Sequence, residues 1–176
     1  VPYFWVPEET IPQRVKANSV PYDVWEKQGY LLATEGNVIH YDFIEKFICD
    51  LGEKYHILEI AVDRWNATHM IQNLEDAGFT MVPFGQGFAS MSTPTKEFYR
   101  LLMEGQIVHA GHPVLRWMAG NVVIETDAAE NIKVTKAKSK EKIDGIVVSM
   151  MALDRCLRNQ GEPQGSVYDG RGLLIL

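Results

Sequence analysis

Residues 57–63 read Ile-Leu-Glu-Ile-Ala-Val-Asp, a short apolar run that ends in an acid. Only one residue interrupts the run, so residues 57–62 are predicted to form a largely buried strand. Asn66 suits a helix cap, and a helix is expected from there to residue 77, followed by a strand over residues 79–84. A strand, a helix and a second strand in this order are typical of a parallel α/β unit.

The sequence on both sides continues this alternation. Amphipathic helices are expected over residues 42–54, from the cap Thr93-Pro94 through Met103, and over residues 143–157. The shorter expected elements are a strand at 3–6 in an otherwise extended opening segment (1–18), a helix at 20–28, strands at 30–33, 38–40 and 107–108, a helix at 114–118, and strands at 122–125 and 131–135 around a turn at 127–130. We therefore predict an α/β domain whose sheet is at least partly parallel.

The composition is that of an ordinary globular domain. Of the 176 residues, 46% are hydrophobic and 23% are charged, which excludes disordered and collagen-like chains. The apolar runs are too short for a transmembrane helix. Cys49 and Cys156 are too few for a disulfide framework or a four-cysteine zinc site, and we interpret them as buried thiols in a reducing cytosol. A net charge of −6 argues against nucleic-acid binding by bulk charge, but it leaves open an enzyme that reaches phosphate through bound cations.

Several catalytic signatures are absent from the sequence. There is no G-x-x-x-x-G-K-[ST] phosphate loop, no G-x-S-x-G nucleophile elbow and no H-E-x-x-H pair. Gly85-Gln86-Gly87 is half of a dinucleotide-binding fingerprint, but the third glycine is missing. We interpret this segment as a flexible turn.

Two aspartates occupy positions from which they could bind cations. Asp63 ends the strand predicted at residues 57–62, at the sheet edge where α/β proteins place their sites, and Asp144 opens the late apolar helix. Each has a simpler explanation, as the start of a loop or as a favourable charge at a helix N-terminus. If the two carboxylates converge, their hard oxygen ligands suit Mg²⁺ or Mn²⁺. Two such ions about 4 Å apart stabilise the attacking and leaving oxygens of phosphodiester cleavage.

Histidines and lysines near these acids are further candidates. His109 could orient a water molecule or hydrogen-bond a scissile phosphate, whereas a packing role is favoured for His112. Five lysines fall within ten residues before the late helix, and they form either a solvated surface segment or a loop that faces phosphate. They are Lys133, Lys136, Lys138, Lys140 and Lys142.

A series of short motifs follows a specific order along the chain. They are FWVPEE (4–9), VPYDVW (20–25), QGYL (28–31), GNVI (36–39), VDRWN (62–66), GQGF (85–88), MSTPTKE (91–97), VHAGHPVLRWM (108–118) and KIDG (142–145). Each motif is weak by itself. In this order they resemble the large terminase subunit of tailed bacteriophages, from residue 1 to about 158.

The resemblance implies the C-terminal nuclease domain of a DNA-packaging motor over residues 1–158, followed by a C-terminal tail over residues 159–176. It implies a ribonuclease-H-like fold, a mixed sheet flanked by helices. In that pattern Asp63 matches the acid that ends the central strand, and Asp144 matches the acid that opens the late helix. The family's first metal-binding aspartate lies on a strand that would precede residue 4, so the domain is expected to lack its first strand or strands.

One position departs from the family pattern. An acid commonly follows the GNVI motif, whereas this chain has His40 there, with Asp42 two residues later. The resemblance also implies that the lysine-rich segment, in particular Lys136, Lys138 and Lys140, lies near DNA.

From these features we expect a metal-dependent endonuclease domain that uses Asp63, Asp144 and His109 to cut concatemeric DNA by two-metal hydrolysis with Mg²⁺ or Mn²⁺. The expected partners are double-stranded DNA, the portal protein and the small terminase subunit, in the cytoplasm of the bacterial host of a phage or prophage and without a membrane. The alternative is a catalytically incomplete docking module that contacts packaging partners. An integrase-like strand transferase of the same fold is a third possibility, and the order of the terminase-like motifs argues against it.

Overall fold

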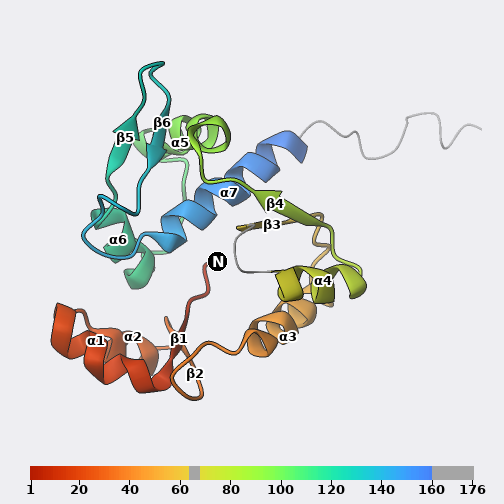
Figure 1. Cartoon of the computed structure of the whole chain (residues 1–176), viewed down its shortest axis with the longest axis vertical. Coiled ribbons are helices and arrows are strands. Elements are labelled where there is room, and N and C mark those ends of the chain that lie inside the picture. Colours follow the sequence, from red (N-terminus) through yellow and green to blue (C-terminus); the bar gives the residue numbers. More distant parts are fainter. Residues whose placement is uncertain (64–67, 160–176) are drawn as a thin grey trace, which may run out of the picture.

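The computed structural model of the chain describes residues 1–63 and 68–159, and strands and helices alternate along it (Figure 1). The strands are β1 (Trp5–Pro7), β2 (Leu32–Thr34), β3 (Ile60–Asp63), β4 (Met81–Phe84), β5 (Ile124–Thr126) and β6 (Ile132–Val134). The helices are a 3-10 turn η1 (Glu8–Thr10), α1 (Ile11–Asn18), α2 (Tyr22–Lys27), α3 (Tyr41–Gly52), α4 (Thr68–Asp76), α5 (Phe88–Met103), α6 (Pro113–Gly120) and α7 (Asp144–Asn159). No helix within these two ranges is long and apolar enough to cross a membrane.

The described strands form three two-stranded sheets. β1 pairs with β2 and β3 pairs with β4, both in parallel, whereas β5 and β6 form an antiparallel hairpin. The β3–β4 pair, connected through α4, confirms the parallel α/β unit that the sequence predicts. In its register Asp63 lies opposite Phe84, so both strands end at the same edge. The predicted cap at residue 66 lies outside the described residues.

The opening segment is not extended as predicted, because it contains the helix α1. The sequence interpretation gave too much weight to its prolines. Pro12 lies in the first turn, where its missing N–H costs nothing, and Ile11 and Val15 present one apolar face a turn apart. Ile11 is buried in the core, and the helix ends at Ser19, which adopts a left-handed conformation with φ 52°.

Helix α5 begins earlier than predicted, at Phe88 rather than at the Thr93-Pro94 cap. Pro94 therefore lies inside the helix, where it is fully buried beside Thr95. Core packing offsets the hydrogen bond that proline removes, so the local start signal was misleading. The strands predicted at residues 38–40 and 107–108 do not form, whereas the predicted hairpin turn does. Asp127 closes that turn, because its Oδ1 accepts hydrogen bonds from the backbone N–H groups of Ala129 and Asn131, each at 2.9 Å.

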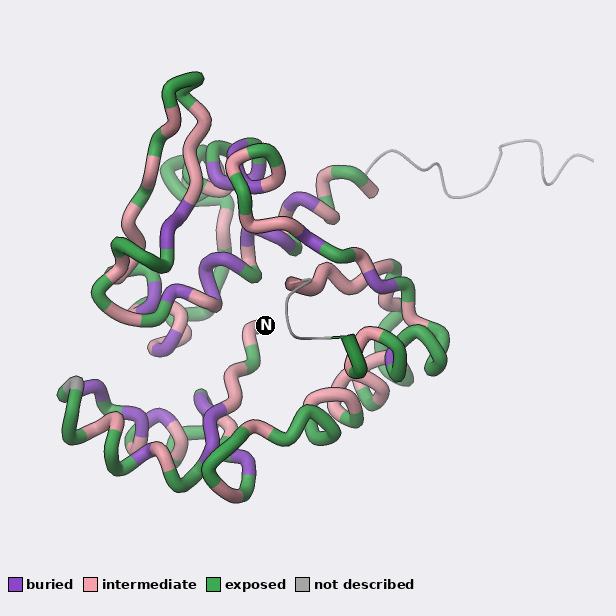
Figure 2. Tube along the Cα trace, viewed as in Figure 1, coloured by how far each residue is buried: buried purple, intermediate pink, exposed green. Residues whose placement is uncertain are grey.

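Helix α7 crosses the centre of the molecule, and Figure 2 shows buried segments along it. It packs against α5, α6 and β3. Its buried apolar side chains are Ile146, Val147, Met150 and Met151, which join the main core cluster. Helix α7 continues to Asn159, the first residue of the predicted tail, and residues 160–176 lie outside the described residues, so the boundary between residues 158 and 159 stays a prediction.

The two cysteines are not buried as predicted. Cys49 is half-buried on α3, and Cys156 is exposed near the end of α7. Both thiols are free. Helical spacing showed that both lie on amphipathic helices, but only the packing of those helices decides which side faces solvent.

Candidate functional site

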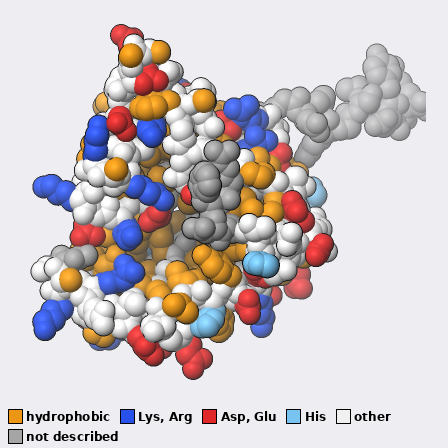
Figure 3. All heavy atoms as spheres, viewed as in Figure 1, with side chains coloured by type: hydrophobic (Ala, Val, Ile, Leu, Met, Phe, Trp, Pro, Cys, Tyr) orange, Lys and Arg blue, Asp and Glu red, His pale blue; other side chains and the backbone are white. Residues whose placement is uncertain are grey.

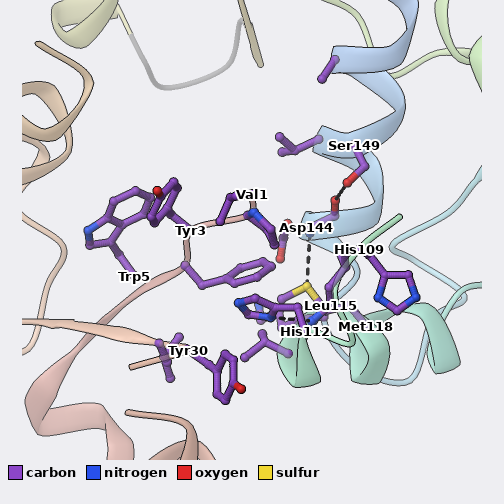
Figure 4. A pocket seen from close by; sticks show the side chains of 18 of the residues that line it. Val1, Tyr3, Trp5, Tyr30, His109, His112, Leu115, Met118, Asp144 and Ser149 are labelled. Carbon is purple, nitrogen blue, oxygen red and sulfur yellow. Dashed lines mark hydrogen bonds between the residues drawn. The ribbon is translucent and has the colours of Figure 1, made fainter. Parts of the chain in front are cut away.

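A large apolar cavity of about 1380 Å³ lies between residues 1–7 and helices α3, α6 and α7. The close-up in Figure 4 shows Tyr3 and Trp5 on one side of it, Asp144 and Ser149 on the other, and Val1 between them beside Asp144. Figure 3 shows hydrophobic side chains gathered in the middle of the face that it draws. The apolar face of α3 also lines the cavity, through Ile44, Phe47, Ile48 and Leu51.

Asp144 lies in the wall of this cavity, at the first residue of α7. Its position is fixed by the buried residues on either side. Ile143 is 1% exposed, and its carbonyl oxygen accepts hydrogen bonds from the N–H groups of Ile146 and Val147. The carboxylate itself is half-exposed, and its Oδ1 lies 2.7 Å from Nζ of Lys136. The fold therefore presents this acid to solvent and to a cationic group.

Asp63 ends β3 and is half-buried. Its Oδ2 accepts a hydrogen bond from Nε2 of Gln86 at 2.6 Å. Sequence reasoning missed Gln86, which it treated as part of a flexible turn. The available signal was that Gln86 follows the neighbouring parallel strand, because the carboxyl ends of parallel strands meet at one edge of the sheet.

The structure does not bring the two aspartates into one complete metal site. Asp144 lines the cavity and Asp63 does not, although the strand and the helix that carry them pack against each other. In the part of the chain that the structure describes, no group of three or more His, Cys, Asp or Glu side chains could hold a metal ion. Their meeting around shared cations stays a prediction.

The chemistry of the two acids nevertheless fits a hard divalent cation. Both offer carboxylate oxygens, the donors that Mg²⁺ and Mn²⁺ prefer. The carboxylate of Asp144 forms an ion pair with an ammonium group, and that of Asp63 accepts a hydrogen bond from an amide.

The two histidines of the VHAGHP motif have different surroundings. His109 is exposed and lines the cavity. His112 precedes α6 and packs against the rings of Phe4 and Tyr30, with centroid distances of 5.3 and 5.1 Å. Its Nδ1 accepts a hydrogen bond from the N–H of Leu115 at 3.5 Å, and burial lowers its pKa, which favours the neutral ring that such an acceptor requires. His112 thus has a structural role, as expected.

The three lysines assigned to DNA are exposed, but two of them have acidic neighbours. Lys136 pairs with Asp144, and Lys138 pairs with Glu125 at 3.0 Å. Lys140 is also exposed. These side chains are therefore accessible to a phosphate backbone, and no contact tests whether they bind one.

An ion-pair network holds Glu59, the residue before β3, against helix α7. Arg155 donates to both carboxylate oxygens of Glu59, at 2.6 and 3.1 Å, and Asn159 donates to the same carboxylate at 3.1 Å. The hydrogen bond from Arg155 lowers the pKa of Glu59. Since β3 begins at the next residue, this network helps to set where Asp63 lies relative to α7.

The fold and the site together define an α/β domain with one acid at the end of a parallel strand and another at the start of a helix. The family model described as the endonuclease domain of the terminase large subunit matches residues 2–160. The chain belongs to this family.

Individual relatives agree with this assignment. The large terminase subunit of Enterobacteria phage HK97 is 34% identical over 170 residues, which covers 96% of this chain and 34% of the relative. The protein YmfN of Escherichia coli K12 is 28% identical over 167 residues, covering 92% of this chain and 37% of YmfN. The crystal structure of the HK97 large terminase superposes with a TM-score of 0.81 at 34% identity, over 88% of this chain and 33% of the other. The fold is the expected ribonuclease-H-like one, and the chain spans about a third of the length of these relatives.

Proposed function

We propose that this endonuclease domain is metal-dependent and cuts concatemeric double-stranded DNA by phosphodiester hydrolysis. The observation that carries the proposal is Asp144, which holds a cationic group at 2.7 Å in the wall of a large cavity. The family membership supports DNA as the substrate. The proposal extends to two Mg²⁺ or Mn²⁺ ions, to the portal protein and small terminase subunit as partners, and to the cytoplasm of the bacterial host.

Each residue has a defined part in this proposal. Asp63 and Asp144 would hold the cations, and bound divalent cations supply the positive charge that stabilises the developing charge on phosphate oxygens. His109 is exposed at the cavity and would orient the attacking water or donate to the scissile phosphate. Lys138 and Lys140 would contact the DNA backbone as point charges that fix its position without reading sequence. In the reaction, the oxygen of water bonds to phosphorus and one P–O bond of the backbone breaks. The departing sugar oxygen takes up the proton that the water releases, which leaves a phosphate on one end and a hydroxyl on the other.

Plasmid cleavage tests the two aspartates directly. The intact chain is incubated with supercoiled plasmid and Mn²⁺, and is compared with Asp63→Asn and Asp144→Asn. Both variants should lose the Mn²⁺-dependent nicking. The matched control is Asp50→Asn, which removes the same charge from an exposed position on α3. An active chain whose activity survives both site substitutions would show that the ligand assignment is wrong.

The cavity favours a second candidate function, a docking module for a packaging partner. Helix α3 is strongly amphipathic, yet none of its residues is buried, because its apolar face borders the cavity (Figure 2). β1 also lines the cavity, and among the described strands it pairs only with β2. An edge strand beside an apolar cavity suits an extended polypeptide with apolar side chains, which adds as a further strand.

Two measurements separate the candidates. Calorimetric titration with Mn²⁺ should detect binding if the domain is an active nuclease. Absent Mn²⁺ binding together with saturable binding of purified portal protein or small terminase subunit would favour the docking module. In the second case, Phe47→Glu should abolish binding of the partner, since it places a charge on the cavity wall.

A further inference from the structure

Lys136 is held in a defined place beside Asp144. It directly follows Thr135, which is 7% exposed and donates its backbone N–H to the carbonyl oxygen of Val123 at 3.0 Å. Ser139 closes the segment on the other side by donating its hydroxyl to the carbonyl oxygen of Thr135 at 2.7 Å. The lysine therefore extends from an anchored piece of backbone, and its ammonium group reaches the carboxylate that opens α7.

The ammonium group of Lys136 is paired with the same carboxylate that the proposed function assigns to a divalent cation. A lysine ammonium is a compact, strongly hydrated point charge, and its Nζ lies 2.7 Å from Oδ1 as an ion pair. A divalent cation bound to this oxygen would meet both a steric and an electrostatic conflict with Nζ. Both side chains of the ion pair are half-exposed, so the pair can separate without a rearrangement of the core.

We propose that Lys136 is a tethered competing cation, which occupies Asp144 in the metal-free protein and is released when a divalent ion binds there. This inference rests on the proposed metal-binding role of Asp144. Once released, Lys136 is free to contact a DNA phosphate, so metal binding and DNA binding assist each other. Thermodynamic linkage makes the two binding events assist each other equally. A phosphate that binds Lys136 therefore also makes Asp144 available to a metal ion.

The size of the competition follows from the exposure of the pair. Half-exposed ion pairs are weak, so their loss changes a competing equilibrium by about 1.5-fold to fivefold. Mn²⁺ titration of Lys136→Gln at low ionic strength should show tighter binding by this factor. Lys136→Arg should bind Mn²⁺ as weakly as the native chain, because the positive charge is retained. Lys54→Gln removes an exposed lysine at the end of α3 and controls for the change in net charge.

Three results of the titration have distinct meanings. Tighter Mn²⁺ binding in Lys136→Gln and unchanged binding in Lys54→Gln would support the proposal. Equal effects of the two substitutions, with binding lost in Asp144→Asn, would overturn the competing role of Lys136 and leave the proposed function intact. Native Mn²⁺ affinity in Asp144→Asn would overturn the metal-binding role itself, and the inference with it.

A metal-free measurement checks the release of the lysine. Asp144→Asn frees Lys136, so in EDTA this variant should bind a short DNA duplex more tightly than the native chain does. The dependence of log affinity on log salt should also steepen by about one, as expected for one added phosphate contact. The double variant Asp144→Asn/Lys136→Gln should lose the added slope, and Asp50→Asn serves as the charge control. An equal slope in the single and the double variant would refute the release. Circular dichroism and melting temperatures establish that all variants fold.

Discussion

Gly145 lies in the first turn of α7, next to Asp144, at a place where a side chain would require its neighbours to shift. A Cβ built on this residue would lie 2.8 Å from both Cε1 and Cζ of Phe4, and 3.0 Å from Sδ of Met118. The N–H of Gly145 also donates to that sulfur at 3.2 Å. Gly145→Ala should therefore push apart the groups that pack beneath Asp144.

Two effects of opposite sign set the magnitude of this substitution. Overpacking a buried site costs about 1–3 kcal/mol. Alanine in a helix gains about 1 kcal/mol over glycine, so the net effect is a destabilisation of about 0–2 kcal/mol. Gly120→Ala is the matched control. That glycine ends α6, and a Cβ there would meet nothing within 4 Å. The control should stabilise the protein by about 0.4–1 kcal/mol.

Urea denaturation measures the comparison. The midpoints of the two variants should shift in opposite directions with an unchanged m-value, and their free energies of unfolding should differ by about 0.5–3 kcal/mol. If Gly145→Ala stabilised the chain as much as Gly120→Ala does, the packing of Phe4 and Met118 under α7 would be wrong.

Two further predictions concern the stability of the domain. Met151→Ala should lower the free energy of unfolding by about 2–5 kcal/mol, whereas Val148→Ala on the same helix should stay within about 0.5 kcal/mol, because Met151 is 2% exposed and Val148 is 56% exposed. Equal losses in urea melts would contradict the assigned face of α7. The pKa of Glu59 is lowered from its ordinary value of 4.5 by Arg155, so the unfolded chain binds more protons in acid. This contribution to stability is complete above pH 4.5 and is lost as the pH falls through the folded-state pKa. Unfolding midpoints measured from pH 6 to pH 3 should fall more steeply in the native chain than in Glu59→Gln, and parallel curves would count against the network.

Local sequence patterns predicted most of the helices and strands, and the order of the short motifs indicated the family. Apolar spacing and caps located α3, α4 and α7, and the apolar run at residues 57–62 predicted β3 to within three residues. These predictions succeeded because helix and strand periods are local properties of the chain. Where two local signals conflicted, the sequence interpretation failed. The prolines of residues 1–18 led to the prediction of an extended segment, although Ile11 and Val15 form a short apolar face on α1. The Thr93-Pro94 cap led to a late start for α5, although the buried face of that helix begins earlier.

The tertiary structure alone decided what each site residue meets. Nothing local to Lys136 and Asp144 shows that their side chains lie 2.7 Å apart, and nothing local to Gln86 shows that it donates to Asp63. These contacts depend on how strands and helices distant in sequence pack against one another. The exposure of Cys156 and the cavity along α3 have the same origin, because periodicity identifies an apolar face but not the partner that covers it.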